Sequence, residues 1–275
     1  MDLTNLSDLR MALKLAGIKP NKELGQHFLI DRPALNKIVA AARINADDTV
    51  LEIGPGVGTL TASLVEAAGQ VVVVEKDAHL ADILKSRFPT IEVVAQDFMK
   101  FDLSALDDYK VVANLPYYIT SKILQALLTA QQPPRSITVL VQKEVAERIT
   151  AEPGQMSVLA FSVQYFGCPQ IIDLVPAASF WPAPEVDSAI LHIDLGNKPA
   201  FAADQQSLFR LVKAGFGERR KMLKNTLAGG LQIDSRLALD LLTAASISPT
   251  ARAQELSMVQ WQALYDQAKT RGRLD

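Results

Sequence analysis

The segment Val50–Thr59 constrains the fold of this chain more than any other part of the sequence. A run of apolar residues leads into Gly54, Gly56 and Gly58, and the residues that follow favour a helix. Glycines in such a turn allow a positive φ angle and leave room for a ligand close to the backbone. A buried strand, a tight glycine turn and a helix in this order are typical of a doubly wound α/β sheet, whose first turn contributes to a cofactor site at the carboxyl ends of the strands.

Apolar runs and helical stretches alternate from this turn to Thr150, as a doubly wound sheet requires. We expect buried strands rich in Val, Ile and Leu at Thr49–Ile53, Val71–Glu75, Ile91–Ala95, Val111–Ala113 and Thr138–Val141. We expect helices at Thr59–Ala68, Ala78–Arg87, Ser121–Ala130 and Lys143–Thr150. This alternation implies right-handed crossovers and a parallel sheet with helices on both faces.

The later segments predict the end of the sheet and a second domain. Val158–Tyr165 and Ile171–Val175 form a possible pair of strands, and the alternating run Ser188–Asp194 suits an antiparallel edge strand. After Gly196–Pro199 the sequence favours helices without strands between them. The predicted fold class is therefore α/β, with a Rossmann-like, mostly parallel sheet in residues 1–197 and a small all-helical domain in residues 198–275.

Composition limits the classes of protein to which the chain can belong. The sole cysteine, Cys168, excludes an internal disulfide or a cysteine metal site, and its neighbours favour a buried or turn thiol. No segment is typical of a signal peptide or approaches the roughly 18 apolar residues that span a bilayer. We therefore expect a cytoplasmic protein without a membrane segment. The net charge is −2, but residues 200–275 hold eleven Lys and Arg against seven Asp and Glu.

The glycine spacing and two strand ends indicate the cofactor. A dinucleotide site spaces its glycines as G-x-G-x-x-G, whereas this chain has G-x-G-x-G with Glu52 two positions before Gly54. That pattern resembles the first motif of class I methyltransferases, whose cofactor is S-adenosylmethionine. Glu75 ends the second strand, where a carboxylate accepts ribose hydroxyls. Asp97 follows the third strand and suits the amino group of the cofactor's adenine.

Asn114, Leu115, Pro116 and Tyr117 follow the fourth strand and predict the chemistry. An exocyclic adenine nitrogen is a poor nucleophile because its lone pair is conjugated with the ring. The side-chain oxygen of Asn114 and a backbone carbonyl stiffened by Pro116 would accept both N–H groups and favour a pyramidal nitrogen. Tyr117 would stack on the target base, and Phe180 would cover its other face.

The ordered motifs of the chain resemble those of the ribosomal RNA adenine N6-dimethyltransferases, in particular the bacterial small-subunit (KsgA/RsmA) branch. They are Leu24–Leu29, Glu52–Gly58, Asn114–Tyr117, Val141–Arg148, Phe180–Ser188 and Phe216–Asn225. The resemblance implies that His27 and Leu29 contact the cofactor, although the family commonly has Asn where this chain has His27. It also maps Gly54, Glu75, Asp97 and Asn114 onto cofactor positions, and Gly56 belongs to the same turn.

This resemblance further implies the substrate and the partner. The family transfers two methyl groups to N6 of each of two adjacent adenines in the hairpin loop near the 3′ end of small-subunit (16S) rRNA, where unstacking a base costs little. The basic residues Arg219, Arg220, Lys221 and Lys224 would hold RNA phosphates. We expect the small ribosomal subunit as partner, a monomeric enzyme and no metal.

Four other interpretations of the sequence are open. The related branch that methylates adenine in large-subunit (23S) RNA and confers macrolide resistance shares the N-terminal motifs, but the Arg219–Asn225 run and the helical tail disfavour it. A DNA adenine methyltransferase often has Pro-Pro where this chain has Leu115-Pro116. An NAD-dependent oxidoreductase would space its glycines differently. A ribosome-assembly factor that acts by binding is compatible with catalysis, and an Asn114→Ala variant would separate the two roles.

Overall fold

A computed structural model describes residues 1–18, 20, 26–196 and 200–274 of the chain. Its contacts divide the chain into two compact units. Unit 1 contains Met1–Ala146 and Cys168–Gly196, and unit 2 contains Glu147–Gly167 and Asn197–Asp275. The predicted boundary at residue 197 lies outside the described residues.

Unit 1 is built on a seven-stranded sheet with the strand order β4-β3-β2-β5-β6-β9-β7. Its strands are β2 (Thr49–Ile53), β3 (Gln70–Glu75), β4 (Glu92–Ala95), β5 (Tyr109–Asn114), β6 (Ser136–Gln142), β7 (Cys168–Val175) and β9 (Ser188–Asp194). The strands from β4 to β6 in this order pair in parallel, and β9 pairs antiparallel with both β6 and β7. The prediction of a mostly parallel sheet that ends in antiparallel strands is confirmed.

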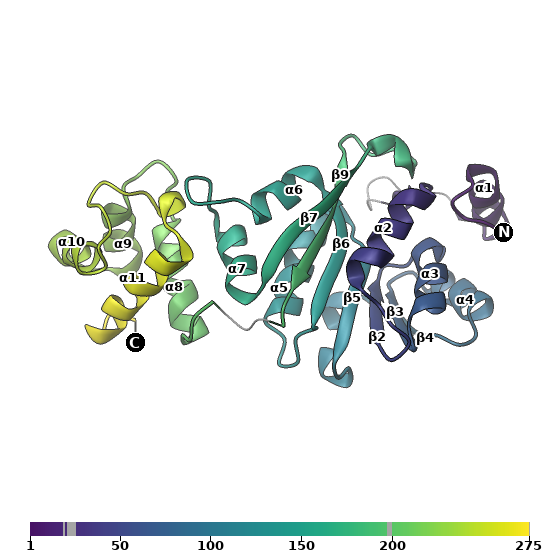
Figure 1. The fold of residues 1–275 in the computed structure, drawn as a ribbon, viewed down its shortest axis with the longest axis horizontal. Coiled ribbons are helices and arrows are strands. Elements are labelled where there is room, and N and C mark those ends of the chain that lie inside the picture. The colour runs from purple at the N-terminus through teal and green to yellow at the C-terminus, as the bar shows by residue number, and fades with distance from the viewer. Residues whose placement is uncertain (19, 21–25, 197–199, 275) are drawn as a thin grey trace. The chain divides into compact units, whose positions relative to one another are not determined.

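Helices pack against the parallel strands and bury their apolar sides. They are α2 (Arg32–Ala42), α3 (Thr59–Ala67), α4 (Ala78–Arg87) and α5 (Thr120–Leu128), with short 3-10 turns η1 (Phe98–Lys100), η2 (Leu103–Ala105) and η3 (Tyr117–Ile119). In Figure 1, α2 crosses one face of the sheet, and its contacts are with β5, β6, β7 and β9. The buried residues Leu35 and Ile38 of α2 pack with Val112 and Leu140 from the centre of the sheet.

The N-terminal helix α1 (Leu6–Leu15) supports the glycine turn. Its buried residues Leu9 and Leu13 form a small apolar cluster with Phe28, Val57 and Leu80. These partners come from strand β1 (Phe28–Leu29), the glycine turn and helix α4. The cluster therefore joins α1 to the turn and to the two segments beside it. Strand β1 pairs antiparallel with β8 (Phe180–Trp181), which follows the turn η4 (Ala177–Ser179).

Unit 2 is helical and has an aromatic core. Helix α6 (Lys143–Ile149) begins in unit 1, and its last residues belong to unit 2. The other elements of unit 2 are α7 (Val158–Phe166), α8 (Gln205–Gly215), α9 (Leu223–Leu231), α10 (Ser235–Ala244), the turn η5 (Ala253–Glu255) and α11 (Met258–Thr270). Phe161 and Tyr165 lie four residues apart on α7 and meet Phe209 edge to face, and Phe161 also meets Trp261. Such pairs add stabilisation beyond area burial.

Helix α7 corrects two expectations. Val158–Tyr165 forms a helix and not a strand, because the Ser157 side chain caps it by accepting from Ala160 N (3.1 Å) and the 3.6-residue period brings Phe161 and Tyr165 to one side. The same aromatic contacts group α7 with the C-terminal helices, so a segment that we had assigned to the first domain belongs to unit 2.

The antiparallel end of the sheet also differs from expectation. Ser188–Asp194 is antiparallel, as predicted, but lies between β6 and β7, so that the edge strand is β7. Cys168 begins this edge strand and is exposed, not buried. The Pro169 backbone lacks an N–H, and β7 is irregular between Ile171 and Asp173, two features that discourage pairing with a further strand.

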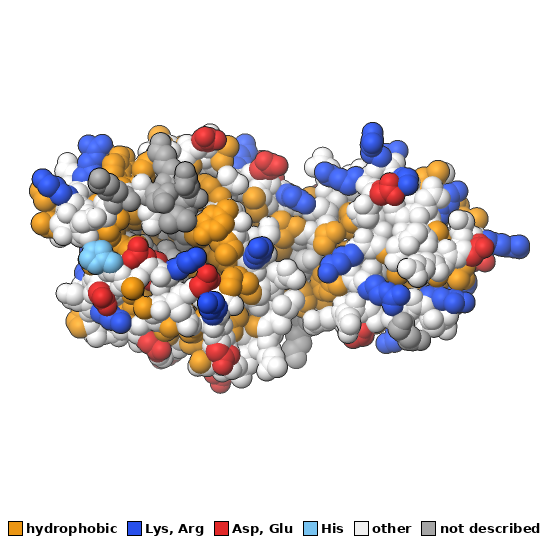
Figure 2. All heavy atoms as spheres, turned by 180° about the vertical axis from the view of Figure 1, so that it is seen from behind, with side chains coloured by type: hydrophobic (Ala, Val, Ile, Leu, Met, Phe, Trp, Pro, Cys, Tyr) orange, Lys and Arg blue, Asp and Glu red, His pale blue; other side chains and the backbone are white. Residues whose placement is uncertain are grey.

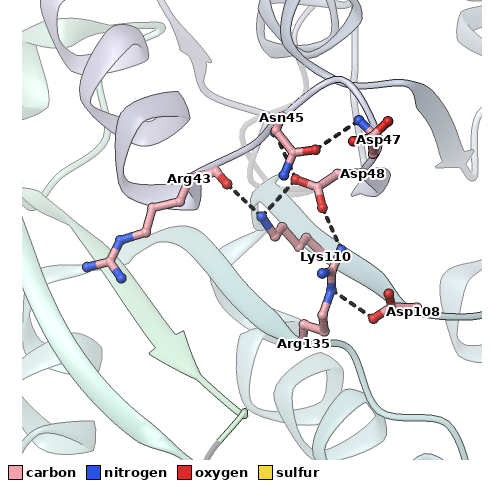
Figure 3. A network of polar contacts seen from close by, with 7 residues as sticks. All are labelled: Arg43, Asn45, Asp47, Asp48, Asp108, Lys110 and Arg135. Carbon is pink, nitrogen blue, oxygen red and sulfur yellow. Dashed lines mark hydrogen bonds and ion pairs between the residues drawn. The ribbon is translucent and has the colours of Figure 1, made fainter.

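A polar network lies at the opposite end of the parallel strands from the glycine turn (Figure 3). The Asp48 carboxylate, only 2% exposed, pairs with Lys110 (2.8 Å) and with Arg135. Lys110 also donates to the Arg43 carbonyl (2.6 Å), and Arg135 reaches Asp108 (2.8 Å). The network ties the start of β2 to the starts of β5 and β6.

Candidate active site

A cavity of about 430 Å³ opens in unit 1 at the carboxyl ends of β2, β3, β4 and β5. This is where a doubly wound sheet binds its ligands. The predicted residues that line it are His27, Leu29, Gly54, Gly56, Glu75, Asp97, Asn114 and Pro116. Segments far apart in the sequence therefore meet in one place, while residues 24 and 25 of the Leu24–Leu29 motif lie outside the described part of the chain.

The glycine turn has the backbone that its sequence requires. Gly54, Gly56 and Gly58 have φ angles of +67°, +59° and +85°, all in the left-handed region. A Cβ on Gly54 would meet nothing within 4 Å, whereas one on Gly58 would lie 2.6 Å from the Phe88 ring. Gly54 therefore leaves open space beside the backbone, and Gly58 permits close packing against the end of α4.

Glu75 is 7% exposed and lies between the turn and the next helix. Its two carboxylate oxygens accept from Gly56 N (3.1 Å) and Asp77 N (3.0 Å). Burial raises the pKa of Glu75, and these hydrogen bonds partly oppose that change. Because each carboxylate oxygen has a second lone pair, Glu75 keeps acceptor capacity toward the cavity, which suits a diol.

Asp97 follows β4 at the rim of the cavity. Its carboxylate accepts from Met99 N (2.9 Å) and lies 3.4 Å from the Lys76 ammonium. The hydrogen bond from Met99, with the Lys76 charge, holds the pKa of Asp97 below its usual range. Asp97 is thus an ionised acceptor at the cavity edge. The sequence did not single out Lys76, although it follows the strand-end residue Glu75 directly.

Glu52 lies beneath the turn, and we assigned it no separate role from the sequence. It is 1% exposed, lines the cavity and accepts from the Thr61 hydroxyl (2.6 Å). Burial raises the pKa of Glu52 to about 8, although the bond from Thr61 acts in the opposite direction. The neutral form of this carboxyl therefore predominates at neutral pH, and that form carries an O–H group that can donate a hydrogen bond.

Asn114 ends β5 and has a fixed amide. Its Nδ2 donates to the main-chain oxygen of His27 (3.0 Å), so the amide oxygen is the group that remains for another donor. The Pro116 carbonyl already accepts from Ile119 N (3.2 Å) and the Thr120 hydroxyl (3.1 Å). Leu115 is buried, and its N–H donates to Leu140 O (3.2 Å), which anchors the turn to β6.

Tyr117 and Phe180, which we predicted to enclose the target base, do not line the cavity. Phe180 is 2% exposed because it belongs to β8, pairs with Leu29 and packs in the core of unit 1. Tyr117 instead stacks on His27, with ring centroids 5.8 Å apart and planes inclined by 19°. The second aromatic ring beside Tyr117 is therefore supplied by a residue that we had expected to contact only the cofactor.

Tyr118 is a second residue that the sequence analysis missed. It is 63% exposed and lines the cavity beside Pro116 and Ile119. Its only sequence signal is that it extends the tetrapeptide by one aromatic residue.

The basic residues lie in unit 2, which carries many Lys and Arg side chains on the face seen in Figure 2. Arg219, Arg220 and Lys221 are exposed and occupy the loop that precedes α9. Lys221 pairs with Glu218 (2.7 Å), and Lys224 is half-buried on the first turn of α9. Arg219 also lines a small cavity of about 120 Å³ that includes Arg148.

Two kinds of feature are absent from the described residues. No group of three or more His, Cys, Asp and Glu side chains there is arranged to hold a metal ion. No helix of that part of the chain is long and apolar enough to cross a membrane.

Comparison with known sequences gives a consistent group of relatives. The family model described as ribosomal RNA adenine dimethylase matches residues 17–269. A protein named ribosomal RNA small subunit methyltransferase A from Dehalococcoides mccartyi is 45% identical over 255 residues, which are 90% of this chain and 88% of that protein. A protein of the same name from Alkaliphilus oremlandii is 38% identical and covers 90% of this chain and 91% of its own length.

Solved structures agree with the sequence matches. A crystal structure of a dimethyladenosine transferase from Plasmodium falciparum superposes with a TM-score of 0.78 and 26% identity, covering 90% of this chain and 98% of that chain. A crystal structure of the 23S rRNA methyltransferase ErmE superposes with a TM-score of 0.72 and 28% identity, covering 88% and 99% of the two chains.

Proposed function

The chain belongs to the ribosomal RNA adenine dimethylase family, and we propose that the cavity of unit 1 is its catalytic site. Its fold is that of the class I methyltransferases. The protein is an S-adenosylmethionine-dependent enzyme that dimethylates adenine in small-subunit (16S) ribosomal RNA. The observation that carries the assignment of the site is the convergence of Gly54, Glu75, Asp97 and Asn114 on one cavity.

The residues of the cavity fit the cofactor. Open space beside Gly54 admits a ligand against the backbone, and the volume of about 430 Å³ suits a nucleoside with a side chain. Glu75 would accept the ribose hydroxyls, and Asp97 would accept the adenine amino group. His27 and Leu29 would close the cavity from the side of β1. When bound, S-adenosylmethionine supplies an electrophilic methyl group on a cationic sulfur.

Asn114 would activate the target nitrogen. Because its Nδ2 is held by the His27 carbonyl, its Oδ1 is oriented to accept one N6 hydrogen of adenine. The Pro116 carbonyl is already engaged, which leaves the Leu115 carbonyl as the backbone acceptor that we propose for the second hydrogen. Both bonds draw the nitrogen toward a pyramidal shape with its lone pair available. The N6 nitrogen then gains a carbon and releases one proton per transfer, so a strong base is not required.

Unit 2 would hold the RNA. We propose that Arg219, Arg220, Lys221 and Lys224 contact phosphates, since basic side chains that bind RNA phosphates release their counterions. We further propose that the target adenines lie in the 3′-terminal hairpin loop, whose bases leave the stack at low cost. Monomeric state and cytoplasmic location stay predictions.

An Asn114→Ala variant tests the assignment of the site. We expect the rate of methyl transfer to fall about 100-fold or more, as for the loss of an oriented transition-state hydrogen bond. The same variant keeps the turn, Glu75 and Asp97, so it should still bind S-adenosylhomocysteine in a calorimeter, with an affinity reduced by the loss of the cofactor contact predicted for Asn114. Asn36→Ala, an exposed position on α2, is the matched control. A variant with full methylation activity at position 114 would exclude the proposed role of this amide.

A further inference from the structure

The cavity of unit 1 is rich in carboxyl groups. The described residues that line it include four with a carboxyl group and one lysine, namely Glu52, Glu75, Asp77, Asp97 and Lys76. The Lys76 side chain is 72% exposed and already lies 3.4 Å from the Asp97 carboxylate. Arg87, at the end of α4, donates to the Val57 carbonyl (3.2 Å) and takes no part in the lining. The wall of this cavity therefore favours a ligand that carries positive charge.

Glu52 is the most deeply buried of these carboxyl groups, at 1% exposed. It pairs with Val73 across β2 and β3, so its side chain lies on the same side of the sheet as that of Glu75, two residues further along β3. Burial and the charge of Glu75 raise the pKa of Glu52 to about 8, and the hydrogen bond from Thr61 (2.6 Å) opposes this change. Glu52 is thus a neutral group in a wall that favours a cation.

The other segments around the cavity leave the charge of Glu52 to be set by a ligand. Helix α2 contributes the apolar residues Leu35 and Ile38 to the lining. Thr59, at the start of α3, also lines the cavity, and its Oγ1 is buried without a hydrogen-bond partner in the described part of the chain. His27 lines it from the side of β1, with Nδ1 2.7 Å from a main-chain carbonyl. The wall is therefore polar at Thr59 and ionisable at Glu52.

We propose that Glu52 releases a proton to solvent when the cationic cofactor binds and takes one up again after the methyl group has left, so that Glu52 favours the cofactor over its product. This inference rests on the proposed function. S-adenosylmethionine carries a positive charge on its sulfur, and S-adenosylhomocysteine has lost that charge with the methyl group. A positive charge inside the cavity favours the ionised form of a carboxyl in its wall. The Thr61 hydroxyl still donates to that form.

The affinity for the cofactor then depends on pH. In the free protein Glu52 is mostly protonated below about pH 8, whereas in the complex it is ionised. Binding of S-adenosylmethionine therefore releases protons below this pH, and its affinity rises as pH increases toward 8. Above that value the rise levels off, because Glu52 is then ionised in both states. A release of half a proton corresponds to about a threefold gain in affinity per pH unit.

Calorimetry in two buffers of equal pH but different ionisation enthalpy counts the protons released on binding. Each protein would be titrated at pH 7 with S-adenosylmethionine and, separately, with S-adenosylhomocysteine, in the absence of RNA so that no methyl transfer takes place. Glu52→Gln is the test variant, because its amide oxygen can still accept from Thr61 but does not titrate. Glu66→Gln, at an exposed position on α3, is the matched control.

We expect the wild type and Glu66→Gln to release about half a proton or more with S-adenosylmethionine, and at least about threefold less with S-adenosylhomocysteine. Glu52→Gln should release about half a proton fewer than the wild type with S-adenosylmethionine. Equal release by the wild type and Glu52→Gln, or equal release with the two ligands in the wild type, would overturn the inference. If Glu52→Gln bound neither ligand, the comparison of the two ligands in the wild type would decide. Wild-type protein that binds neither ligand would instead refute the proposed function itself.

Discussion

Replacing Asp48 by Asn should destabilise unit 1 through the network in Figure 3. The Asp48 carboxylate is almost fully buried and accepts from Lys110 Nζ, Arg135 and the N–H of Asn45. Lys110 is itself only 12% exposed. The substitution keeps the shape of the side chain but removes its charge, so the Lys110 cation stays buried without an opposite charge.

The size of the effect follows from burial. Removing one partner of a buried ion pair costs about 3–5 kcal/mol. Lys110 would keep the Arg43 carbonyl and gain a neutral amide oxygen, so we expect the lower end, about 3 kcal/mol. That value corresponds to a roughly 150-fold larger opening equilibrium. Arg135 is 45% exposed, and its pairing adds little because solvent screens it.

Hydrogen exchange of amides in β2 and β5 measures this change in the unit concerned, because the slowest amides report the free energy of opening. Asp47→Asn is the matched control: Asp47 is the adjacent residue, and its side chain is exposed. A loss below about 1 kcal/mol at Asp48, the range of a surface ion pair, would refute the reasoning.

The difference in stability between the wild type and Asp48→Asn should depend on pH. Burial acts to raise the pKa of Asp48, but the hydrogen bonds from Lys110 and Asn45 and the nearby positive charges outweigh it and hold the pKa below its usual range. A carboxyl with a depressed pKa stabilises the fold fully above its unfolded pKa of about 3.9 and loses that contribution as pH falls through the folded value. The difference between wild type and Asp48→Asn should therefore be constant near neutral pH and shrink below about pH 4.

Two predictions concern the cavity. Glu75→Gln should weaken S-adenosylhomocysteine binding about 10-fold or more in a calorimeter, because an amide N–H would face the N–H of Gly56 or Asp77 and one acceptor would be lost; unchanged affinity would exclude Glu75 as a ligand. Glu52→Gln should flatten the pH dependence of unfolding: the folded pKa of about 8 exceeds the unfolded value, so the wild type loses stability as pH rises toward 8, whereas an amide that still accepts from Thr61 does not titrate. If the melting temperatures of the two proteins changed by the same amount between pH 6 and pH 9, this prediction would be contradicted.

The central strands of the sheet could be predicted because they are buried on both faces. Runs such as Val71–Glu75 contain nothing that competes with a strand, and the glycine turn after Ile53 fixes where the first helix begins. Glu75, Asp97 and Asn114 follow consecutive strands, so the parallel topology alone brings them to one edge. The order of strands and helices along the chain was therefore enough to predict where these three side chains lie.

Other features depend on contacts that no local pattern encodes. The apolar run at Val158–Tyr165 is too short for its period to distinguish a strand from a helix, and its cap and its aromatic partners decide the outcome. The bond between Asn114 and His27 joins residues 87 positions apart. The burial of Phe180 likewise results from pairing with β1. Sequence analysis named residues that line the cavity but did not predict that Tyr117 stacks on His27.

The most direct test of the central claim is to map the methylated nucleosides. The protein would be incubated with methyl-labelled S-adenosylmethionine and with unmethylated small or large ribosomal subunits, and the RNA would be digested and analysed by mass spectrometry. We predict N6,N6-dimethyladenosine at two adjacent positions in the 3′ hairpin of small-subunit RNA and none in the sample treated with Asn114→Ala. Label found only in large-subunit RNA, or on a nucleoside other than adenosine, would contradict the account.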